Sequence, residues 1–238
     1  MKRKILFAST FLVASSLMIV SSCKKTEDSD NTSPVVTLNG SASEEVSLGG
    51  SYTDPGATAH DDVDGAVTVT SDYSSTNPNI NRVNSYTITY TAYDAAGNTG
   101  SATRTVRVKN DAEGYVGTYT VTDTCGGLPL APFTQSIYVD SITNNRIHFT
   151  KFANYANNTG IYGTRFAADD HFEIPFQAAN SIGTGAGACD VVDHTFVSQA
   201  PGSITIVNGS VFKISYTDAV ITGGCTGSTS CISYFVKQ

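Results

Sequence analysis

The sequence has no tryptophan, little charge and only 7 prolines among its 238 residues. Charged residues make up 15% of the chain, whereas an average soluble domain holds about 25%. That scarcity excludes coiled coils and long-helix proteins, which are rich in charged residues, alanine and leucine. A hydrophobic fraction of 40% also excludes a classical disordered chain. Threonine, serine, glycine and asparagine fill the gap together with 12 Tyr and 11 Phe, a mixture that favours strands and turns, so we expect an all-β protein.

The apolar stretch near the N-terminus is too short and too polar for a membrane span, which needs about 20 apolar residues. Residues 1–22 instead have the shape of a signal peptide: a basic start, then Ile5 to Val20, then small residues before Cys23. The ending Val20-Ser21-Ser22-Cys23 resembles a bacterial lipobox, which implies cleavage before Cys23 and acylation of its thiol and amine. An ordinary secretory signal is the alternative. We expect acylated Cys23 to anchor the chain in a lipid bilayer.

Residues 24–33 contain no apolar residue, so we expect residues 23–33 to form a flexible tether. A cysteine followed by lysine and then acidic residues resembles the export signal of surface-exposed lipoproteins in some Gram-negative bacteria. That resemblance implies an outer-membrane lipoprotein facing the cell exterior; a plain solvated linker is the alternative. Without the basic residues of the signal peptide, 11 basic and 21 acidic residues remain, a net charge of −10, so we expect no nucleic acid partner.

Residues 34–110 predict a first β domain of short strands, for which a β-sandwich is the favoured architecture. The clearest strand runs from Ser85 to Tyr93, where apolar residues alternate with threonines. The sequence Asp94 to Asn98 predicts a hairpin turn after it. The residues expected on the buried face of this strand are Tyr86, Ile88, Tyr90 and Ala92. The other expected strands are Pro34–Leu38, Glu45–Leu48, Gly65–Thr70 and Ala102–Val108.

Four blocks in this region carry a family resemblance. They are residues 35–40, VVTLNG; residues 52–57, YTDPGA; residues 61–65, DDVDG; and residues 86–98, YTITYTAYDAAGN. Together they resemble the bacterial Ig-like domain first noticed in a pesticidal crystal protein. That resemblance implies a spacer or adhesion module, not an enzyme. The family usually has glycine two residues before the first tyrosine of the long strand, where this chain has Asn84; asparagine tolerates a left-handed φ, so we expect the turn to survive.

A run of aspartates in the first domain offers oxygen ligands for a cation. Calcium takes 6–8 oxygens, which acidic loops between strands can supply. The run lacks the EF-hand spacing, however, and aspartate also stabilises turns through its own backbone. We expect turn stabilisation and no metal or other cofactor, with calcium as the alternative. The aspartates weighed are Asp54, Asp61, Asp62 and Asp64, of which Asp61, Asp62 and Asp64 are the calcium candidates.

Residues 113–238 hold 16 of the 23 tyrosines and phenylalanines. Turn signals divide them into eight or nine predicted antiparallel strands, and Asn208-Gly209 is the strongest hairpin signal. Such a meander removes its edges by closing into a barrel or a strongly curled sheet. The opening Gly117-Thr118-Tyr119 and the final strand resemble the lipocalin-like domains of Gram-negative surface lipoproteins, although the tryptophan of lipocalins is missing. The predicted strands are Gly117–Cys125, Phe133–Asp140, Arg146–Phe152, Gly160–Phe166, His171–Gln177, His194–Gln199, Ser203–Val207, Val211–Tyr216 and Cys231–Val236.

Four cysteines lie in this second region, and an extracytoplasmic location permits disulfides. Four cysteines allow three connectivities. If the first and last strands pair, Cys125 would meet Cys231, and Cys189 would then pair with Cys225. The spacing contains no CxxC pair, which argues against zinc.

Histidines and carboxylates of the second region supply the enzymatic alternative, a glycan-active or other hydrolase or an isomerase acting through Asp169, His171 and Glu173. Polar residues on an outer strand face have the same pattern, and His194 with Asp190 and Asp193 fits it equally. The sequence contains no Gly-x-Ser-x-Gly elbow, HExxH motif or P-loop. We therefore expect a non-catalytic protein.

The order of anchor, tether, Ig-like spacer and terminal β domain resembles that of lipid-anchored glycan-capture proteins. We expect the second region to bind a glycan, a small ligand or a neighbouring surface protein. Tyr115, Tyr155 and Tyr162 are candidates for stacking on a sugar, since tryptophan is absent. A filled domain interior would favour a structural or protein-binding role, and a large apolar pocket a small ligand. Asp140-Ser141-Ile142 resembles an O-glycosylation acceptor of exported Gram-negative proteins.

Overall fold

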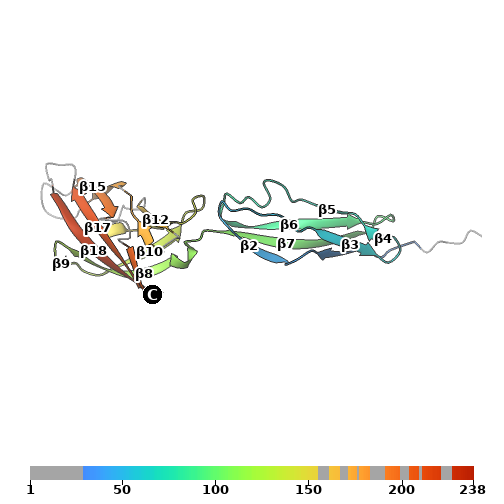
Figure 1. Cartoon of the computed structure of the whole chain (residues 1–238), viewed down its shortest axis with the longest axis horizontal. Coiled ribbons are helices and arrows are strands. Elements are labelled where there is room, and N and C mark those ends of the chain that lie inside the picture. The colour runs from blue at the N-terminus through green and yellow to red at the C-terminus, as the bar shows by residue number, and fades with distance from the viewer. Residues whose placement is uncertain are drawn as a thin grey trace, which may run out of the picture.

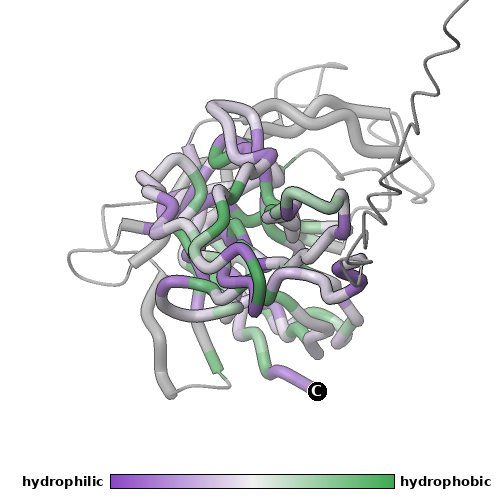
Figure 2. The backbone as a smooth tube through the Cα atoms, turned by 90° about the vertical axis from the view of Figure 1, so that its right-hand side faces the viewer, coloured by the Kyte–Doolittle hydropathy of each residue, from purple (hydrophilic) through white to green (hydrophobic). Residues whose placement is uncertain are grey.

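The computed structural model describes residues 29–154, 161–166, 171–175, 177–182, 191–198, 204–208, 211–220 and 227–238. Two groups of strands lie end to end (Figure 1). We call β1–β7 the first domain and β8–β18 the C-terminal domain. Seen along the long axis, hydrophobic and hydrophilic stretches alternate along the backbone, as strands with one inward face require (Figure 2). Within the described part of the chain, no helix has the length and apolarity to cross a membrane.

The first domain consists of two sheets, as the sandwich prediction requires. One has the strand order β1-β3-β4 and the other β2-β7-β6-β5. All pairings within them are antiparallel except that of β2 with β7, which is parallel. The strands are β1 (Val35–Leu38), β2 (Ser43–Ser47), β3 (Ala57–Asp61), β4 (Gly65–Val67), β5 (Val69–Ser71), β6 (Asn84–Tyr93) and β7 (Thr99–Lys109).

The hairpin of β6 and β7 is the centre of the first domain. Its ten-residue register runs from Asn84 paired with Val108 to Tyr93 paired with Thr99. Ile88, Tyr90 and Ala92 are buried, which confirms most of the expected inward face, whereas Tyr86 at its start is half-buried. The predicted turn is also confirmed, because the amide of Asp94 donates to the carbonyl of Asn98, with a distance of 3.2 Å.

Two expectations for the first domain need correction. The predicted strand Gly65–Thr70 is two strands, because β4 pairs with β3 while β5 pairs with β6 in the other sheet. The chain changes sheets at Thr68, a connection that sandwiches use and that alternation alone does not show. Asn84 does not adopt a positive φ; it is the first residue of β6 and pairs with Val108.

A hydrogen-bonded joint connects the two domains. The Asn110 side chain is 1% exposed, and its amide donates to the carbonyls of Asp140 (2.9 Å) and Thr143 (2.8 Å). Its oxygen accepts from the amides of Ala112 and Asn145. The amide of Val83 in the first domain also donates to the Ser141 carbonyl (2.8 Å). The Asn110 side chain therefore attaches the linker to the loop after β10 through both its amide nitrogen and its oxygen.

One sheet forms the C-terminal domain, with the order β13-β12-β11-β10-β8-β18-β17-β15-β14; β16 pairs with β17 and β9 with β8. Every pairing is antiparallel. The strands are β8 (Gly117–Cys125), β9 (Leu128–Pro129), β10 (Phe133–Val139), β11 (Arg146–Phe149), β12 (Tyr162–Phe166), β13 (His171–Glu173), β14 (Gln177–Ile182), β15 (Val191–Ser198), β16 (Ile204–Asn208), β17 (Val211–Val220) and β18 (Gly227–Lys237).

The sheet is a curled half-barrel, the second of the two forms that the meander predicts. The first and last strands, β8 and β18, pair in its middle, and no ladder among the described strands joins β13 to β14. The predicted strand His171–Gln177 ends at Glu173. Pro175 follows, and proline has no amide to donate to a ladder. The hairpin predicted at Asn208-Gly209 is confirmed by the pairing of β16 with β17.

Aromatic side chains fill the inside of the half-barrel wherever the structure describes it. Phe152 lies 4.9 Å from Tyr216 and 5.1 Å from Phe149, and Phe149 lies 5.9 Å from Phe235, between ring centroids. All four are at most 1% exposed. The aromatic residues concentrated in this part of the sequence therefore form its core.

Candidate functional site

Three rings form a row on the outer face of the half-barrel. Tyr138 of β10 pairs with His148 of β11, and His148 pairs with Tyr162 of β12. Strand alternation sends the neighbouring Ile137 and Ile147 into the core, so these rings face outward. The Tyr138 and His148 rings are stacked, with centroids 5.0 Å apart and planes 13° apart. The centroids of His148 and Tyr162 are 6.0 Å apart. We call these three residues the aromatic ladder.

Charged groups flank the aromatic ladder. Nε2 of His148 lies 2.8 Å from Oδ2 of Asp140, and the Arg146 guanidinium lies 4.2 Å from the centroid of the Tyr162 ring. The other oxygen of Asp140 accepts from the amides of Ile142 (2.8 Å) and Thr143 (2.9 Å). Burial alone would raise the pKa of Asp140, but the His148 hydrogen bond and these amides outweigh it and lower that pKa. Asp140 is therefore an ionised acceptor at neutral pH.

A shallow depression of about 360 Å³ lies beside the ladder. Its lining is Tyr138, Val139, Asp140, Ser141, Ile142 and His148. Tyr138 is 43% exposed and Ile142 is 67% exposed. The surface of the depression therefore combines aromatic rings, an apolar side chain and the Asp140 carboxylate. Such a mixture suits a ligand with an apolar face and hydroxyl groups. Aromatic rings pack against an apolar face, and charged groups form hydrogen bonds with hydroxyl groups.

Sequence reasoning identified one member of the ladder. Tyr162 belongs to it, Tyr115 is half-buried and packs against the core, and Tyr155 lies outside the described residues. Tyr138 and His148 were missed. The turn signal at Asn144-Asn145 predicts that the two strands pair, but the register that sets positions 138 and 148 opposite each other comes from the longer loop 141–145, closed by the amide of Asp140 on the carbonyl of Arg146.

The residues of the enzymatic alternative are not brought together by any described contact. His171 and Glu173 lie on β13, and His194 and Asp193 lie on β15, on opposite halves of the strand order. Asp169 and Asp190 lie outside the described residues, as do the side chains of His171 and His194.

The predicted pairing of Cys125 with Cys231 is present as a disulfide. The two residues are direct partners in the register of β8 and β18, and the bond closes a sequence separation of 106 residues. The structure thus fulfils the condition on which the prediction rested, the pairing of the first and last strands. Cys23, Cys189 and Cys225 lie outside the described residues.

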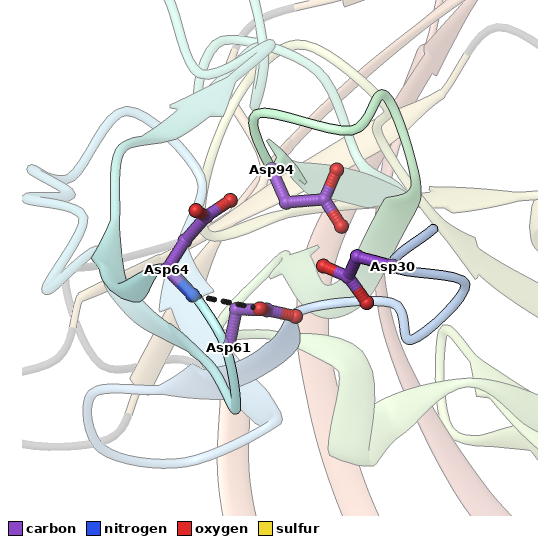
Figure 3. Close-up of side chains that lie close together, drawn as sticks. All are labelled: Asp30, Asp61, Asp64 and Asp94. Carbon is purple, nitrogen blue, oxygen red and sulfur yellow. Dashed lines mark hydrogen bonds between the residues drawn. The ribbon is translucent and has the colours of Figure 1, made fainter. Parts of the chain in front are cut away.

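The aspartates of the first domain separate into two groups. Asp54 is the partner of Arg104: its Oδ1 lies 2.5 Å from Nη1 of that guanidinium and accepts from the Tyr90 hydroxyl at 2.5 Å. Asp61 and Asp64 instead meet Asp30 and Asp94, with one ligand atom of each within 4.8 Å of all the others (Figure 3). Asp62, the third calcium candidate, is exposed and is not part of this group.

Turn stabilisation by Asp61 is confirmed as well. Its Oδ1 accepts from the amides of Val63 (2.8 Å) and Asp64 (3.1 Å). Oδ1 of Asp94 accepts from the Asn98 amide at 2.7 Å. Sequence reasoning missed Asp30, which it assigned to the tether; its carbonyl accepts from Nδ2 of Asn98 at 3.1 Å. The sequence gives no signal for this contact, because residues 24–33 contain no apolar residue that would predict packing against the domain.

Part of the chain matches the model of a known domain family. Residues 36–108 match the model of the Ig-like domain of bacterial surface proteins. The first domain is thus an Ig-like domain of the class found on bacterial surfaces, which fits a surface location and a binding or structural role. No curated protein matches the chain.

Two solved structures show distant likeness. A lipoprotein from Bacteroides thetaiotaomicron is 13% identical with a TM-score of 0.29, over 86% of this chain and 100% of its own. The CBM51-2 domain in complex with GlcNAc and INT domains from Clostridium perfringens ZmpB is 18% identical with a TM-score of 0.24; the alignment covers 86% of this chain and 44% of that one. TM-scores this low support no conclusion about fold or function.

Proposed function

We propose that the chain is an outer-membrane lipoprotein of the cell exterior in which the first domain is a spacer and the C-terminal domain binds a glycan without catalysis. The aromatic ladder is the observation that carries the binding role. The described interior of the half-barrel is filled with rings, so a ligand would use the outer face. The ladder supplies rings and a charged rim on that face, next to the depression that Asp140 lines.

The anchoring part of the proposal is supported by the sequence. The Val20-Ser21-Ser22-Cys23 ending resembles a lipobox, and the match to a surface Ig-like family fits an exported protein. In the structure, the start of the described chain and the C-terminal domain lie at opposite ends of the first domain (Figure 1). This arrangement would place the half-barrel away from the bilayer, whether or not its fold is related to that of lipocalins.

The binding role is tested with the full-length chain on a glycan array, followed by calorimetric titration of the best glycan. Tyr138→Ala should weaken binding by about 10-fold or more, which is about 1.4 kcal/mol. Tyr234→Ala is the matched control, because Tyr234 is also 43% exposed but lies on β18, outside the ladder. It should bind like the parent chain.

Three results would contradict the proposal. Equal loss in Tyr138→Ala and Tyr234→Ala, or no array signal at all, would remove the ladder as a glycan site. Cleavage of the bound glycan, seen by mass spectrometry after incubation, would favour the hydrolase alternative. The same cleavage in the His171→Ala variant would exclude the group Asp169, His171 and Glu173.

The anchor is tested in bacterial cells by labelling with a fatty acid analogue and by protease treatment of whole cells. The parent chain should incorporate the label and be cleaved from outside, whereas Cys23→Ser should incorporate none. Label without outside cleavage would place the anchored chain in the periplasm.

A further inference from the structure

Three segments meet at the end of the first domain that lies away from the C-terminal domain (Figure 1). Asp61 ends β3 and Asp64 follows in the turn to β4, Asp94 begins the turn between β6 and β7, and Asp30 precedes β1. Their carboxylates point toward a common centre (Figure 3). One oxygen from each lies within 4.8 Å of the others. We call these residues the acidic cluster.

Asp61 carries an oxygen that the described protein does not satisfy. The residue is 1% exposed, and only its Oδ1 accepts hydrogen bonds, from Val63 and Asp64. Its Oδ2 is buried without a hydrogen-bond partner and faces the centre of the acidic cluster (Figure 3). Oδ2 of Asp30 is buried without a partner in the same way. A buried carboxylate oxygen without a donor is costly, so two of them in one cluster of carboxylates indicate a missing positive group.

No described cation neutralises the acidic cluster. The ion pairs among the described residues involve other carboxylates: Glu44, Glu45, Asp54, Glu113 and Asp140. Both oxygens of Asp94 accept from Asn98, one from its amide and the other from its Nδ2, each at 2.7 Å, but these donors carry no charge. Four carboxylates therefore converge without an internal counter-charge.

We propose that the acidic cluster is a calcium site that fastens the N-terminal segment to the first domain. Oxygen ligands lie about 2.3–2.6 Å from Ca²⁺, so ligands on opposite sides are about 4.6–5.2 Å apart, which matches the spread of the four oxygens. Water or the second carboxylate oxygens would complete the 6–8 ligands that calcium takes. Magnesium binds less well, because it requires a smaller and more regular octahedron.

The same site would fix the point where the tether ends. Asp30 belongs to the segment before β1, and its carbonyl already accepts from Asn98 in the turn that holds Asp94. Further along the same segment, the carbonyl oxygen of Pro34 would lie 1.8 Å from a Cβ at Gly100, so the segment packs directly on β7. Calcium would join Asp30 to both hairpin turns and set the direction in which the first domain leaves the anchor.

The test uses the full-length chain purified in detergent and treated with a chelator. Calcium titration should release or absorb heat with one site per chain, and 1 mM calcium should raise the first-domain Tm by about 5 °C or more. Magnesium at the same concentration should raise it less. Asp61→Asn should abolish both responses, and Asp62→Asn, in the same turn but outside the cluster, should keep them.

A second readout follows the N-terminal segment itself. Calcium should slow proteolysis between residues 24 and 34 in the parent chain and in Asp62→Asn, but not in Asp30→Asn. If Asp61→Asn fails to fold, the exposed Asp64→Asn variant replaces it. The proposal is overturned if the parent chain shows neither heat nor a Tm shift in 10 mM calcium, or if Asp62→Asn loses as much as Asp61→Asn. Glycan binding by the aromatic ladder enters none of these measurements.

Discussion

The two domains are held together by different means. The first domain has a small apolar core around Ile88, Tyr90 and Val106, and its largest fully buried side chain is that of Arg104. Among its described residues, the C-terminal domain has a core of thirteen buried apolar residues and a disulfide between β8 and β18. A domain with few large apolar residues thus depends on charged groups arranged in pairs, whereas an aromatic-rich domain depends on packing and a covalent bond.

Arg104 shows how the first domain satisfies a buried charge. Its guanidinium donates to Asp54 and to the backbone carbonyls of Ser41 (2.9 Å) and Asn39 (2.5 Å). Burial raises the pKa of the Tyr90 hydroxyl, which donates to the same carboxylate of Asp54. The acidic cluster of this domain lacks such an internal cation. The difference between these two groups of aspartates is what the calcium proposal rests on.

The largest expected effect is on the buried ion pair. Arg104→Met leaves Asp54 buried without its cation, which should cost about 3–5 kcal/mol of first-domain stability. Arg107→Met is the control, because Arg107 pairs with exposed Glu45 and Glu113 and should cost about 1 kcal/mol or less. Urea unfolding of the full chain measures both. Equal losses of stability in the two variants would mean that the buried ion pair of Arg104 stabilises this domain no more than an exposed ion pair does.

Removal of the disulfide tests the other half of the comparison. The Cys125→Ser, Cys231→Ser double variant should lose about 2–5 kcal/mol in the C-terminal domain. The first-domain transition should stay where it is, as calorimetry would show. A shift in both transitions would show that the two domains unfold as one unit.

A smaller effect is expected at the joint. Asn110→Ala removes four hydrogen bonds and leaves their partners without Asn110, a cost of about 1–3 kcal/mol. Small-angle X-ray scattering should show a broader distribution of domain orientations than for the parent chain. An unchanged scattering profile would mean that the remaining hydrogen bonds, Val83 with Ser141 and Asp111 with Asn144, hold the joint.

The smallest effect is a difference in pH dependence between two aspartates. Burial raises the pKa of Asp123 in the C-terminal domain, so its ionisation destabilises that domain as the pH rises above the unfolded pKa of about 3.9. Asp123→Asn should therefore add about 1 kcal/mol at pH 7 and nothing at pH 3. Burial alone would raise the pKa of Asp94, but hydrogen bonds from Asn98 and the turn amides outweigh it and lower that pKa, so its stabilisation is present at neutral pH and is lost as the pH falls below about 4. Asp94→Asn should therefore destabilise calcium-free protein at pH 7 but not at pH 2, as chemical unfolding would show.

The sequence predicted the parts of the fold that depend on local alternation. It placed the strand Ser85–Tyr93 within one residue and the strand Gly117–Cys125 without error. It did not predict the change of sheet at Thr68 or the break at Pro175, because both depend on which partner strand lies alongside. The same limit applies to the candidate sites. Tyr138 and His148 become neighbours only through register, and Asp30 joins the acidic cluster only after the hairpins have formed.

The parallel pairing of β2 with β7 has a mechanical consequence. β2 lies near the N-terminal end of the first domain's sequence, and β7 leads directly into the joint. Tension between an anchored N-terminus and a C-terminal domain held by its ligand would pull these strands in opposite directions along their length. The hydrogen bonds of the five-residue ladder between Ser43–Ser47 and Thr105–Lys109 would then be loaded together in shear, instead of opening one by one like a zip.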